Sequence, residues 1–284
     1  MMHPAITPGA VAVITGGASG IGLAAAKKLA SLGLRVCIAD LGADRLARAR
    51  EAVVAVATGG DADVMTSETD VSRVEALVAL EAAVTAQFGG TNVLLNNAGI
   101  GPRSTALGPA ESWARTIEVN LWGVIHGTQV FVPRMIEQGR PGLVINTGSK
   151  QGITTPPGNP AYNVSKAGVK AFTEALQHEL RNTPGCQISA HLLIPGFVFT
   201  ELTGSGRTDK PAGAWTSEQT IDFMLERLAE NDFYILCPDN EVPRSLDERR
   251  ILWAAGDLVE NRPPLSRWHP DHAEAFKAFA SQRK

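Results

Sequence analysis

Short apolar runs alternate with longer segments of helical period over most of the chain. The runs are rich in β-branched residues and predict buried strands, whereas the segments between them predict covering helices. The predicted strands span Val11–Thr15, Arg35–Asp40, Val64–Asp70, Asn92–Asn97, Gly142–Ser149 and Ile188–Ile194. The predicted helices span Ile21–Leu32, Asp44–Ala57, Ser72–Phe88, Glu111–Gln138 and Ala161–Arg181. Pro133 is expected to bend or break the fourth of these helices.

This alternation favours an α/β fold. Each connection between strands is long enough for a right-handed crossover, so we expect a Rossmann-like doubly wound parallel sheet with helices on both faces. The sequence contains no internal repeat and no low-complexity linker, and residues 1–284 are interpreted as a single domain. Thr203–Gly213 is rich in Gly, Thr and Ser and predicts a mobile loop, and we expect a substrate loop over about residues 200–216.

The end of the chain extends beyond the last predicted strand. Asp232–Pro238 can supply a seventh strand, and a C-terminal extension follows over about residues 239–284. A helix is predicted near Leu246–Val259. The charged run Asp247–Arg250 is expected to form an exposed face of that helix.

Composition and charge exclude several classes of function. The 284 residues carry 26 Lys and Arg against 29 Asp and Glu, a net charge of −3, which predicts no nucleic-acid and no membrane partner. No apolar run reaches the roughly 18 residues of a membrane span, and residues 1–9 lack the features of a signal peptide. We therefore expect a cytoplasmic protein. The three cysteines and six histidines show neither a disulfide framework nor a metal-ligand spacing, so no metal is expected.

A glycine-rich turn, Thr15–Gly22 (TGGASGIG), joins the first predicted strand to the first helix. Glycines allow the backbone to approach a pyrophosphate, whose charge then meets the helix N-terminus. Asp40 ends the second strand, where a carboxylate can accept both hydroxyls of an adenosine ribose and would repel a 2′-phosphate. No Lys or Arg directly follows Asp40, so NAD is the expected cofactor. A plain tight turn and a helix-capping acid are the alternative interpretations.

Tyr162 and Lys166 are four residues apart on a predicted helix and therefore share one face. An ammonium group close to the phenol favours the phenolate and brings its pKa toward the working pH. Tyr162 can then exchange a proton with an alcohol or carbonyl oxygen. Ser149, at the end of the fifth predicted strand, would hydrogen-bond the same oxygen.

Taken together, these motifs resemble the short-chain dehydrogenase/reductases over roughly residues 11–200. The pieces that carry the resemblance are Thr15–Gly22, Asp70-Val71, Asn96-Asn-Ala-Gly99, Asn120, Ser149, Tyr162-x-x-x-Lys166 and Pro195-Gly-Phe-Val-Phe-Thr200. The resemblance implies four catalytic residues: Ser149, Tyr162, Lys166 and Asn120. It implies a cofactor site made of Gly16, Ser19, Gly20, Ile21, Gly22, Asp40, Asp70, Val71, Asn97, Gly99, Tyr162, Lys166, Val198 and Thr200. The Asp-Gly-Gly that many members carry after the last strand is missing here, which puts the family's common tetramer in doubt.

We therefore expect an NAD-dependent oxidoreductase that moves a hydride between the nicotinamide and a secondary alcohol or ketone, with a hydrophobic cyclic or aromatic substrate. The alternatives are an NAD-dependent reductase of a biosynthetic or acyl keto intermediate, and a nucleotide-sensing regulator without turnover. A homodimer or homotetramer is expected. The five tryptophans are interpreted as core or interface residues, except Trp215, which follows the mobile loop and is a candidate for covering the substrate.

Overall fold

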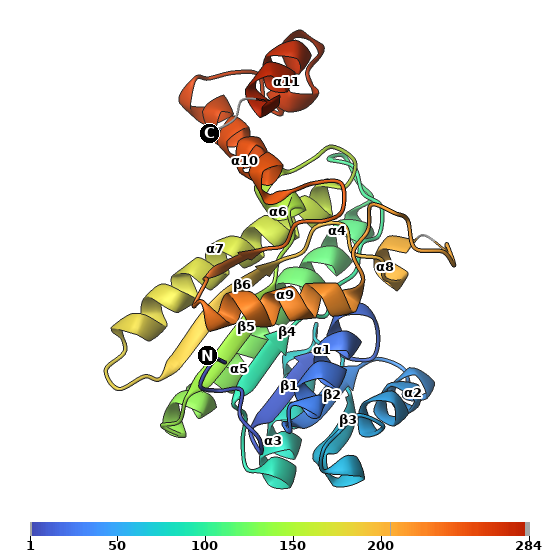
Figure 1. Ribbon diagram of the computed structural model, residues 1–284, viewed down its shortest axis with the longest axis vertical. Helices are drawn as coiled ribbons and strands as arrows, with labels where there is room; N and C mark the ends of the chain where they lie inside the picture. Colours follow the sequence, from blue (N-terminus) through green and yellow to red (C-terminus); the bar gives the residue numbers. More distant parts are fainter. Residues whose placement is uncertain (1, 205, 282–284) are drawn as a thin grey trace.

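The computed structural model describes residues 2–204 and 206–281, and over these residues the chain forms a seven-stranded parallel sheet with helices on both faces (Figure 1). The strands are β1 (Val11–Thr15), β2 (Arg35–Asp40), β3 (Val64–Glu68), β4 (Val93–Asn96), β5 (Gly142–Thr147), β6 (Ile188–Ile194) and β7 (Tyr234–Leu236). Their order in the sheet is β3-β2-β1-β4-β5-β6-β7. The predicted single-domain, doubly wound, Rossmann-like fold is confirmed. The order reverses between β1 and β4, and at such a switch point the strand ends leave a crevice for a ligand.

The helices follow the strands along the chain. The α-helices are α1 (Gly20–Ser31), α2 (Ala43–Val54), α3 (Val74–Phe88), α4 (Ala110–Ile117), α5 (Gly123–Glu137), α6 (Gln151–Thr154), α7 (Pro160–Asn182), α8 (Glu201–Gly204), α9 (Ser217–Ala229), α10 (Arg244–Val259) and α11 (Ala273–Ser281). Shorter turns of 3-10 helix are η1 (Gly60–Asp63), η3 (Ser266–Trp268) and η4 (Pro270–His272), and η2 (Glu118–Trp122) is a π-helical turn.

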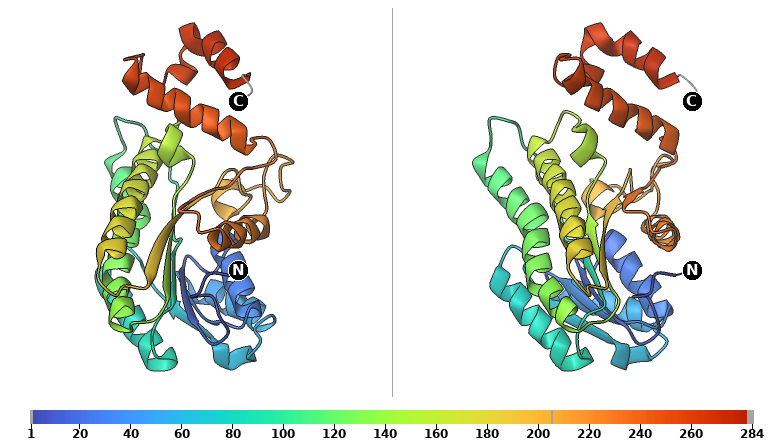
Figure 2. Two further views of the ribbon diagram at one scale, coloured as in Figure 1. Left: turned by 60° about the vertical axis from the view of Figure 1, so that its left-hand side comes forward. Right: turned by 90° about the vertical axis from the view of Figure 1, so that its left-hand side faces the viewer.

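The sheet separates two hydrophobic cores, because alternate side chains of each strand point to opposite faces. In β1, Ala12 and Ile14 contribute to the core under α1, α2 and α9, whereas Val11 and Val13 contribute to the core under α3, α5 and α7. Figure 2 shows the sheet between these two helical layers. Burial on both faces explains why the strands are continuous apolar runs rather than alternating ones.

The long predicted helix over 111–138 forms, with an irregularity that we did not expect. Pro133 lies inside α5, which continues to Glu137, so the helix does not break there, and the alternative of a bend stays a prediction. The helix instead changes to a π-helical turn at η2, between α4 and α5. A π-turn inserts an extra residue and often occurs at functional sites. Here it contains Asn120.

Sequence reasoning missed several short helices and the longer helix α9. Thr216 and Gln219 form a complete capping box at the start of α9, in which each side chain bonds the other residue's backbone N–H. The pattern Thr-x-x-Gln before an apolar segment is a known signal for a helix start. That signal predicts α9, and it was available in the sequence.

The C-terminal extension forms a helical unit that projects from the body of the molecule (Figure 1). Trp253 of α10 is buried and contacts the rings of Phe276 and Phe279 from α11. The predicted helix near 246–259 is confirmed as α10. Asp247 is buried, however, and pairs with Lys150, so the expectation of an exposed charged face is wrong at this residue.

Neither a membrane span nor a metal site is found among residues 2–204 and 206–281. No helix there is long and apolar enough to cross a bilayer. No group of three or more His, Cys, Asp or Glu side chains there is arranged to hold a metal ion.

Candidate active site

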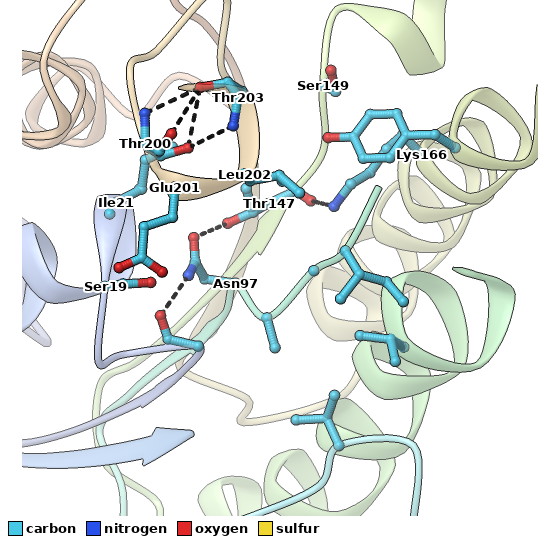
Figure 3. Close-up of a pocket in the computed structure, with 18 of the residues that line it drawn as sticks. Ser19, Ile21, Asn97, Thr147, Ser149, Lys166, Thr200, Glu201, Leu202 and Thr203 are labelled. Carbon is cyan, nitrogen blue, oxygen red and sulfur yellow. Dashed lines mark hydrogen bonds between the residues drawn. The ribbon is translucent and has the colours of Figure 1, made fainter. Parts of the chain in front are cut away.

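A cavity of about 870 Å³ opens at the carboxyl ends of the strands, over the switch point between β1 and β4. Its wall combines the glycine-rich turn, the end of β2, the segment after β4, the end of β5, the start of α7 and the segment after β6. Figure 3 shows side chains from these segments facing one another. The sheet topology therefore brings the separate sequence motifs into one continuous site.

The glycine-rich turn has no room for a side chain at Gly16 or Gly20. Gly16 has φ +63°, and a Cβ on it would lie 2.7 Å from Ala98 Cα. Gly20 has φ +51°, and a Cβ there would lie 3.1 Å from Thr200 Cγ2. Ser19, at the N-cap of α1, makes no capping bond, and the first turn of α1 contains no acidic residue. No residue of the first turn therefore caps the positive end of α1, which faces the cavity and fits the diphosphate of a dinucleotide.

Asn97, directly after β4, holds this turn in place. Its Nδ2 donates to the carbonyl oxygens of Thr15 and Gly16, each at 3.2 Å. Its backbone N–H donates to Thr15 Oγ1 at 3.0 Å, and its Oδ1 accepts from Thr147 Oγ1 at 3.4 Å (Figure 3). Asn97 thus connects β1, β4 and β5 at the floor of the cavity.

At the other end of the cavity, Asp40 closes β2 as predicted. Its two carboxylate oxygens accept from the backbone N–H groups of Ala18, at 2.9 Å, and Leu41, at 2.8 Å. One basic residue also lines this end, although it does not directly follow Asp40. Arg45 of α2 reaches the cavity and pairs with Glu201 of α8 at 3.3 Å. Figure 3 shows Glu201 extending toward the turn that carries Ser19.

The proposed catalytic side chains meet at the opposite end. Helix α7 begins where Asn159 caps it and Pro160 fixes its first turn, which directs Tyr162 and Lys166 to the cavity. Lys166 is 4% exposed, and its Nζ donates to the Thr147 carbonyl oxygen at 2.8 Å. The Lys166 ammonium lies 5.8 Å from the centroid of the Tyr162 ring. Ser149 lies two residues beyond β5 and hydrogen-bonds Tyr162.

Burial and hydrogen bonding shift the acidities of these groups. Burial raises the pKa of Tyr162 above its ordinary value, and the hydrogen bond with Ser149 opposes that rise. Burial lowers the pKa of Lys166 to about 8. Sequence analysis expected Lys166 to favour the phenolate. In the structure the Ser149 hydrogen bond favours the phenolate, and Lys166 Nζ donates to Thr147 O; the effect of Lys166 on Tyr162 stays a prediction.

Asn120 does not line the cavity but supports its edge. It is fully buried, and its carboxamide pairs with the backbone of Ile100: Oδ1 accepts from the N–H at 2.8 Å, and Nδ2 donates to the carbonyl at 2.9 Å. Nδ2 also donates to Ser165 Oγ at 3.2 Å. Asn120 therefore links the π-turn η2 and α7 to the segment after β4. Its predicted catalytic role remains a prediction.

Most of the residues that we predicted from the sequence converge on the cavity. Those that line it are Gly16, Ser19, Gly20, Ile21, Asp40, Asp70, Val71, Asn97, Gly99, Ser149, Tyr162, Lys166, Val198 and Thr200. Gly22 does not line it. A Cβ on Gly22 would lie 2.1 Å from the Gly16 carbonyl oxygen, so this glycine allows α1 to pack against the turn.

Several lining residues were missed by sequence reasoning. They include Leu41, Arg45, Thr69, Glu111, Arg115, Glu118, Ile100, Lys150, Gln151, Phe197, Glu201 and Leu202. Of these, Phe197 belongs to the Pro195–Thr200 motif and Leu202 to the predicted substrate loop, although neither was predicted as a site residue. Lys150 and Gln151 could have been predicted, because they directly follow Ser149 at the end of a strand and therefore lie at the same edge of the sheet. No local pattern indicates Arg45 or Glu201.

The predicted substrate loop over 200–216 is partly ordered by contacts at its ends. Residues 201–204 form α8, and the backbone N–H of Trp215 donates to Phe197 O at 2.8 Å. The Trp215 ring packs against Phe223 of α9, at 5.6 Å between centroids. Trp215 therefore does not line the cavity in this structure, and its covering of a substrate stays a prediction. Residue 205, inside the loop, lies outside the described residues.

Comparison with known proteins places this arrangement in a family. Residues 10–211 match the short chain dehydrogenase family. The chain is 32% identical over 263 residues to 1-deoxy-11-beta-hydroxypentalenate dehydrogenase of Streptomyces exfoliatus, covering 90% of this chain and 93% of the relative.

Solved structures agree with the sequence match. A short chain dehydrogenase/reductase of Burkholderia phymatum in complex with NAD superposes with a TM-score of 0.80 at 32% identity, covering 90% of this chain and 96% of the other. Levodione reductase superposes with a TM-score of 0.65 at 30% identity, covering 70% and 76%. The resemblance deduced from the motifs is thereby confirmed, and the chain belongs to the short-chain dehydrogenases, a family of oxidoreductases.

Proposed function

We propose that the protein is an NAD-dependent dehydrogenase that interconverts a secondary alcohol and its ketone. The observation that carries this proposal is the division of one cavity into two chemically distinct ends. Asp40 and the uncapped N-terminus of α1 form the end suited to an adenosine diphosphate. Ser149, Tyr162 and Lys166 form the end suited to proton exchange with a substrate oxygen.

The chemistry divides between cofactor and protein. A bound nicotinamide supplies the acceptor or donor for the hydride. Tyr162 would take the alcohol proton during oxidation and return it during reduction, and Ser149 would hold the same oxygen. Thr147 O fixes the Lys166 ammonium beneath this pair. Its positive charge would stabilise a phenolate once the site is closed to water.

The wall around these groups indicates the substrate class. Ile100, Phe197 and Leu202 line the cavity with apolar surface. A hydrophobic cyclic or aromatic alcohol would bury its ring against these residues. The S. exfoliatus relative is named as a dehydrogenase of a hydroxy compound, and this supports oxidation of an alcohol.

The experiment that tests this proposal is a screen of NAD⁺ reduction with the purified chain and a panel of cyclic, aromatic and steroid secondary alcohols. Tyr162→Phe removes one hydroxyl and keeps the ring. We expect its kcat to fall by at least about 10²-fold on the best alcohol, the lower range for loss of a general acid or base. The Kd for NAD, measured by titration, should barely change.

The chain offers a matched control, because it contains only one other tyrosine. Tyr234 is exposed on β7 and hydrogen-bonds Glu174, outside the cavity lining. Tyr234→Phe should keep the wild-type kcat. Retention of more than half of the wild-type kcat by Tyr162→Phe would contradict the assignment, and a fall in both variants would indicate a general effect of losing a tyrosine hydroxyl.

A further inference from the structure

Lys150 follows the proposed catalytic Ser149, and two buried carboxylates hold its side chain. Lys150 Nζ lies 2.5 Å from Asp247 Oδ2 and 3.3 Å from Asp239 Oδ2. The side chains are largely buried, with exposed fractions of 16% for Lys150, 7% for Asp239 and 5% for Asp247. Among the described residues, the Lys150 ammonium is the only donor group in contact with Asp247 Oδ2. Lys150 is therefore the cation in closest contact with Asp247.

This cluster joins parts of the chain that are far apart in sequence. Lys150 lies at the start of α6, Asp239 follows β7, and Asp247 belongs to α10 of the C-terminal extension. The other Asp239 oxygen, Oδ1, accepts from the backbone N–H groups of Glu241 and Val242, at 3.2 and 2.8 Å. Asp239 is thus fixed by its own loop before it meets Lys150.

The same cluster also fixes the segment after β6, which forms a wall of the cavity. Asp239 Oδ2 accepts from the Phe197 backbone N–H at 3.2 Å. The Lys150 backbone N–H donates to Pro195 O at 3.3 Å. A Cβ on Gly196 would lie 2.7 Å from Asp239 Oδ2 and 2.8 Å from Lys150 Nζ, so this glycine lets the ion cluster approach the backbone.

Further charges surround Asp247. Arg250 Nη1 lies 3.9 Å from Asp247 Oδ1. Burial and repulsion by Arg250 lower the pKa of Arg267 to about 10, and the charge of Asp247 opposes that shift. Cations from α10 and η3 therefore surround the carboxylate that reaches Lys150.

We propose that Lys150, held by Asp239 and Asp247, is a positioning residue through which the C-terminal extension sets the substrate wall of the active site. Without the ion cluster, the Ser149 turn and the segment at Gly196–Phe197 lose their shared anchor. The glycine-rich turn and Asp40 lie at the other end of the cavity and do not contact the cluster. Substrate affinity should therefore depend on Asp247 more strongly than NAD affinity does, because Val198 and Thr200 are the only expected cofactor residues in the anchored segments.

Removing one carboxylate from this buried ion cluster leaves the Lys150 ammonium with Asp239 as its remaining acidic partner, so the anchored segments should loosen measurably. The variant that tests this is Asp247→Asn, which keeps the side-chain shape and removes the charge. Its matched control is Glu137→Gln, which makes the same chemical change in an exposed ion pair with Arg134 on α5.

The first measurement is hydrogen exchange of the free chain, which requires no turnover. In Asp247→Asn we expect peptides covering residues 148–155 and 196–204 to exchange about tenfold faster, a loss of about 1.4 kcal/mol in local opening free energy. Peptides from β1 to β4 should keep their wild-type rates. Unchanged rates at 148–155 and 196–204, or equal acceleration across the whole sheet, would overturn the proposal.

The second measurement is kinetic and rests on the proposed dehydrogenase function. With NAD⁺ and 1-phenylethanol as the probe, Asp247→Asn should raise the KM for the alcohol by about tenfold, the size of one lost ionic contact. The Kd for NAD should change less than about twofold. A purely structural role would lower the active fraction, and thus kcat, while leaving KM unchanged. If the wild type does not oxidise the alcohol, the proposed function fails for this probe, and the exchange result still decides the positioning role.

A third variant tests whether the two residues act together. Lys150→Met keeps the aliphatic stem over Gly196 and removes the charge. Both carboxylates then lose the Lys150 ammonium. The amide hydrogens of the double variant Lys150→Met with Asp247→Asn should therefore exchange no faster than those of Lys150→Met alone. Strictly additive effects of the two changes would show that they act independently, which the proposal excludes.

Discussion

Asp40 has two roles at the adenosine end of the cavity. Its carboxylate already accepts two backbone N–H groups, one of them from Ala18 in the glycine-rich turn. It therefore shapes the turn as well as presenting negative charge to a ribose. Arg45 lines the same region, but its charge is directed to Glu201. The net field at the ribose hydroxyls should still disfavour a 2′-phosphate.

From these contacts we expect NAD to be preferred over NADP by at least about tenfold in kcat/KM, roughly 1.4 kcal/mol. Asp40→Ala should narrow that gap, and Asp40→Asn, which keeps the size of the side chain, should narrow it as well. Steady-state kinetics with both cofactors measures the ratio.

The control for this prediction is Arg45→Gln. If Arg45 held a 2′-phosphate, its loss would selectively weaken the use of NADP; our assignment expects the preference for NAD to persist. Equal kcat/KM of the wild type with both cofactors would contradict the role of Asp40 in selecting NAD.

At this scale the sequence predicts those residues whose role follows from a local pattern. Tyr162 and Lys166 share a helical face, and Gly16 and Gly20 belong to one turn, so their spacing reveals them. Arg45 and Glu201 are more than 150 positions apart in the chain, and only the packing of α2 near α8 brings them together. Asp247 looked like part of a solvated charge run because its partner, Lys150, lies 97 positions earlier in the chain.

Among the elements, the segment over 200–216 is the predicted substrate loop, and its described residues reach the cavity. Its ends are fixed by the bonds between Phe197, Phe199 and Trp215, and the Asn240 side chain donates to Ala212 O at 2.7 Å. The apolar side chain of Leu202 lies at the cavity and is 48% exposed. An element with fixed ends and an exposed apolar residue at the site is suited to close over a ligand.

We therefore predict that amide hydrogens across Leu202–Ala214 exchange fast in the free enzyme and slowly in a ternary complex with cofactor and substrate. Closure would exclude water from the path of the hydride and cover Leu202. Mass-spectrometric exchange with and without ligands measures this, and peptides from α9 serve as the internal reference. Strong protection without ligands would show that the segment is a rigid scaffold.

Secondary structure was predictable where side-chain periodicity is strong. Every strand from β1 to β6 was located, because burial on both faces leaves a continuous apolar run. The π-turn η2 was not, because the residues on either side of it keep a helical pattern. Pro133 misled us. A proline inside a helix lacks one N–H bond and its ring needs space, and α5 accommodates both.

At the scale of the whole molecule, the N-terminal segment is fixed to the sheet by histidines. His3 Nε2 and His191 Nε2 both contact Ser189 Oγ, at 3.0 and 2.9 Å. Burial, with a smaller effect of the charge on His191, lowers the pKa of His3 from 6.5 to about 4. The folded protein thus keeps His3 neutral at pH values where the unfolded chain protonates it.

The difference in the His3 pKa between the folded and unfolded protein makes the stability of the fold depend on pH. The stability that neutral His3 contributes is complete above pH 6.5 and is lost as the pH falls from there toward 4. We expect the urea midpoint of the wild type to fall more between pH 7.5 and pH 5 than that of His3→Gln, which cannot take up the proton. Parallel pH profiles of the two proteins would show that His3 is not responsible.

The position of Asp239 and Asp247 near the end of the chain also affects the order in which the protein is built. During synthesis β1 to β5 emerge before the C-terminal extension, whereas a domain generally folds as a unit. The ribosome therefore makes the glycine-rich turn, Ser149 and Thr200 before the two carboxylates that anchor Lys150. A chain that stopped before Asp239 would carry every residue that lines the cavity but would lack the anchor of its substrate wall.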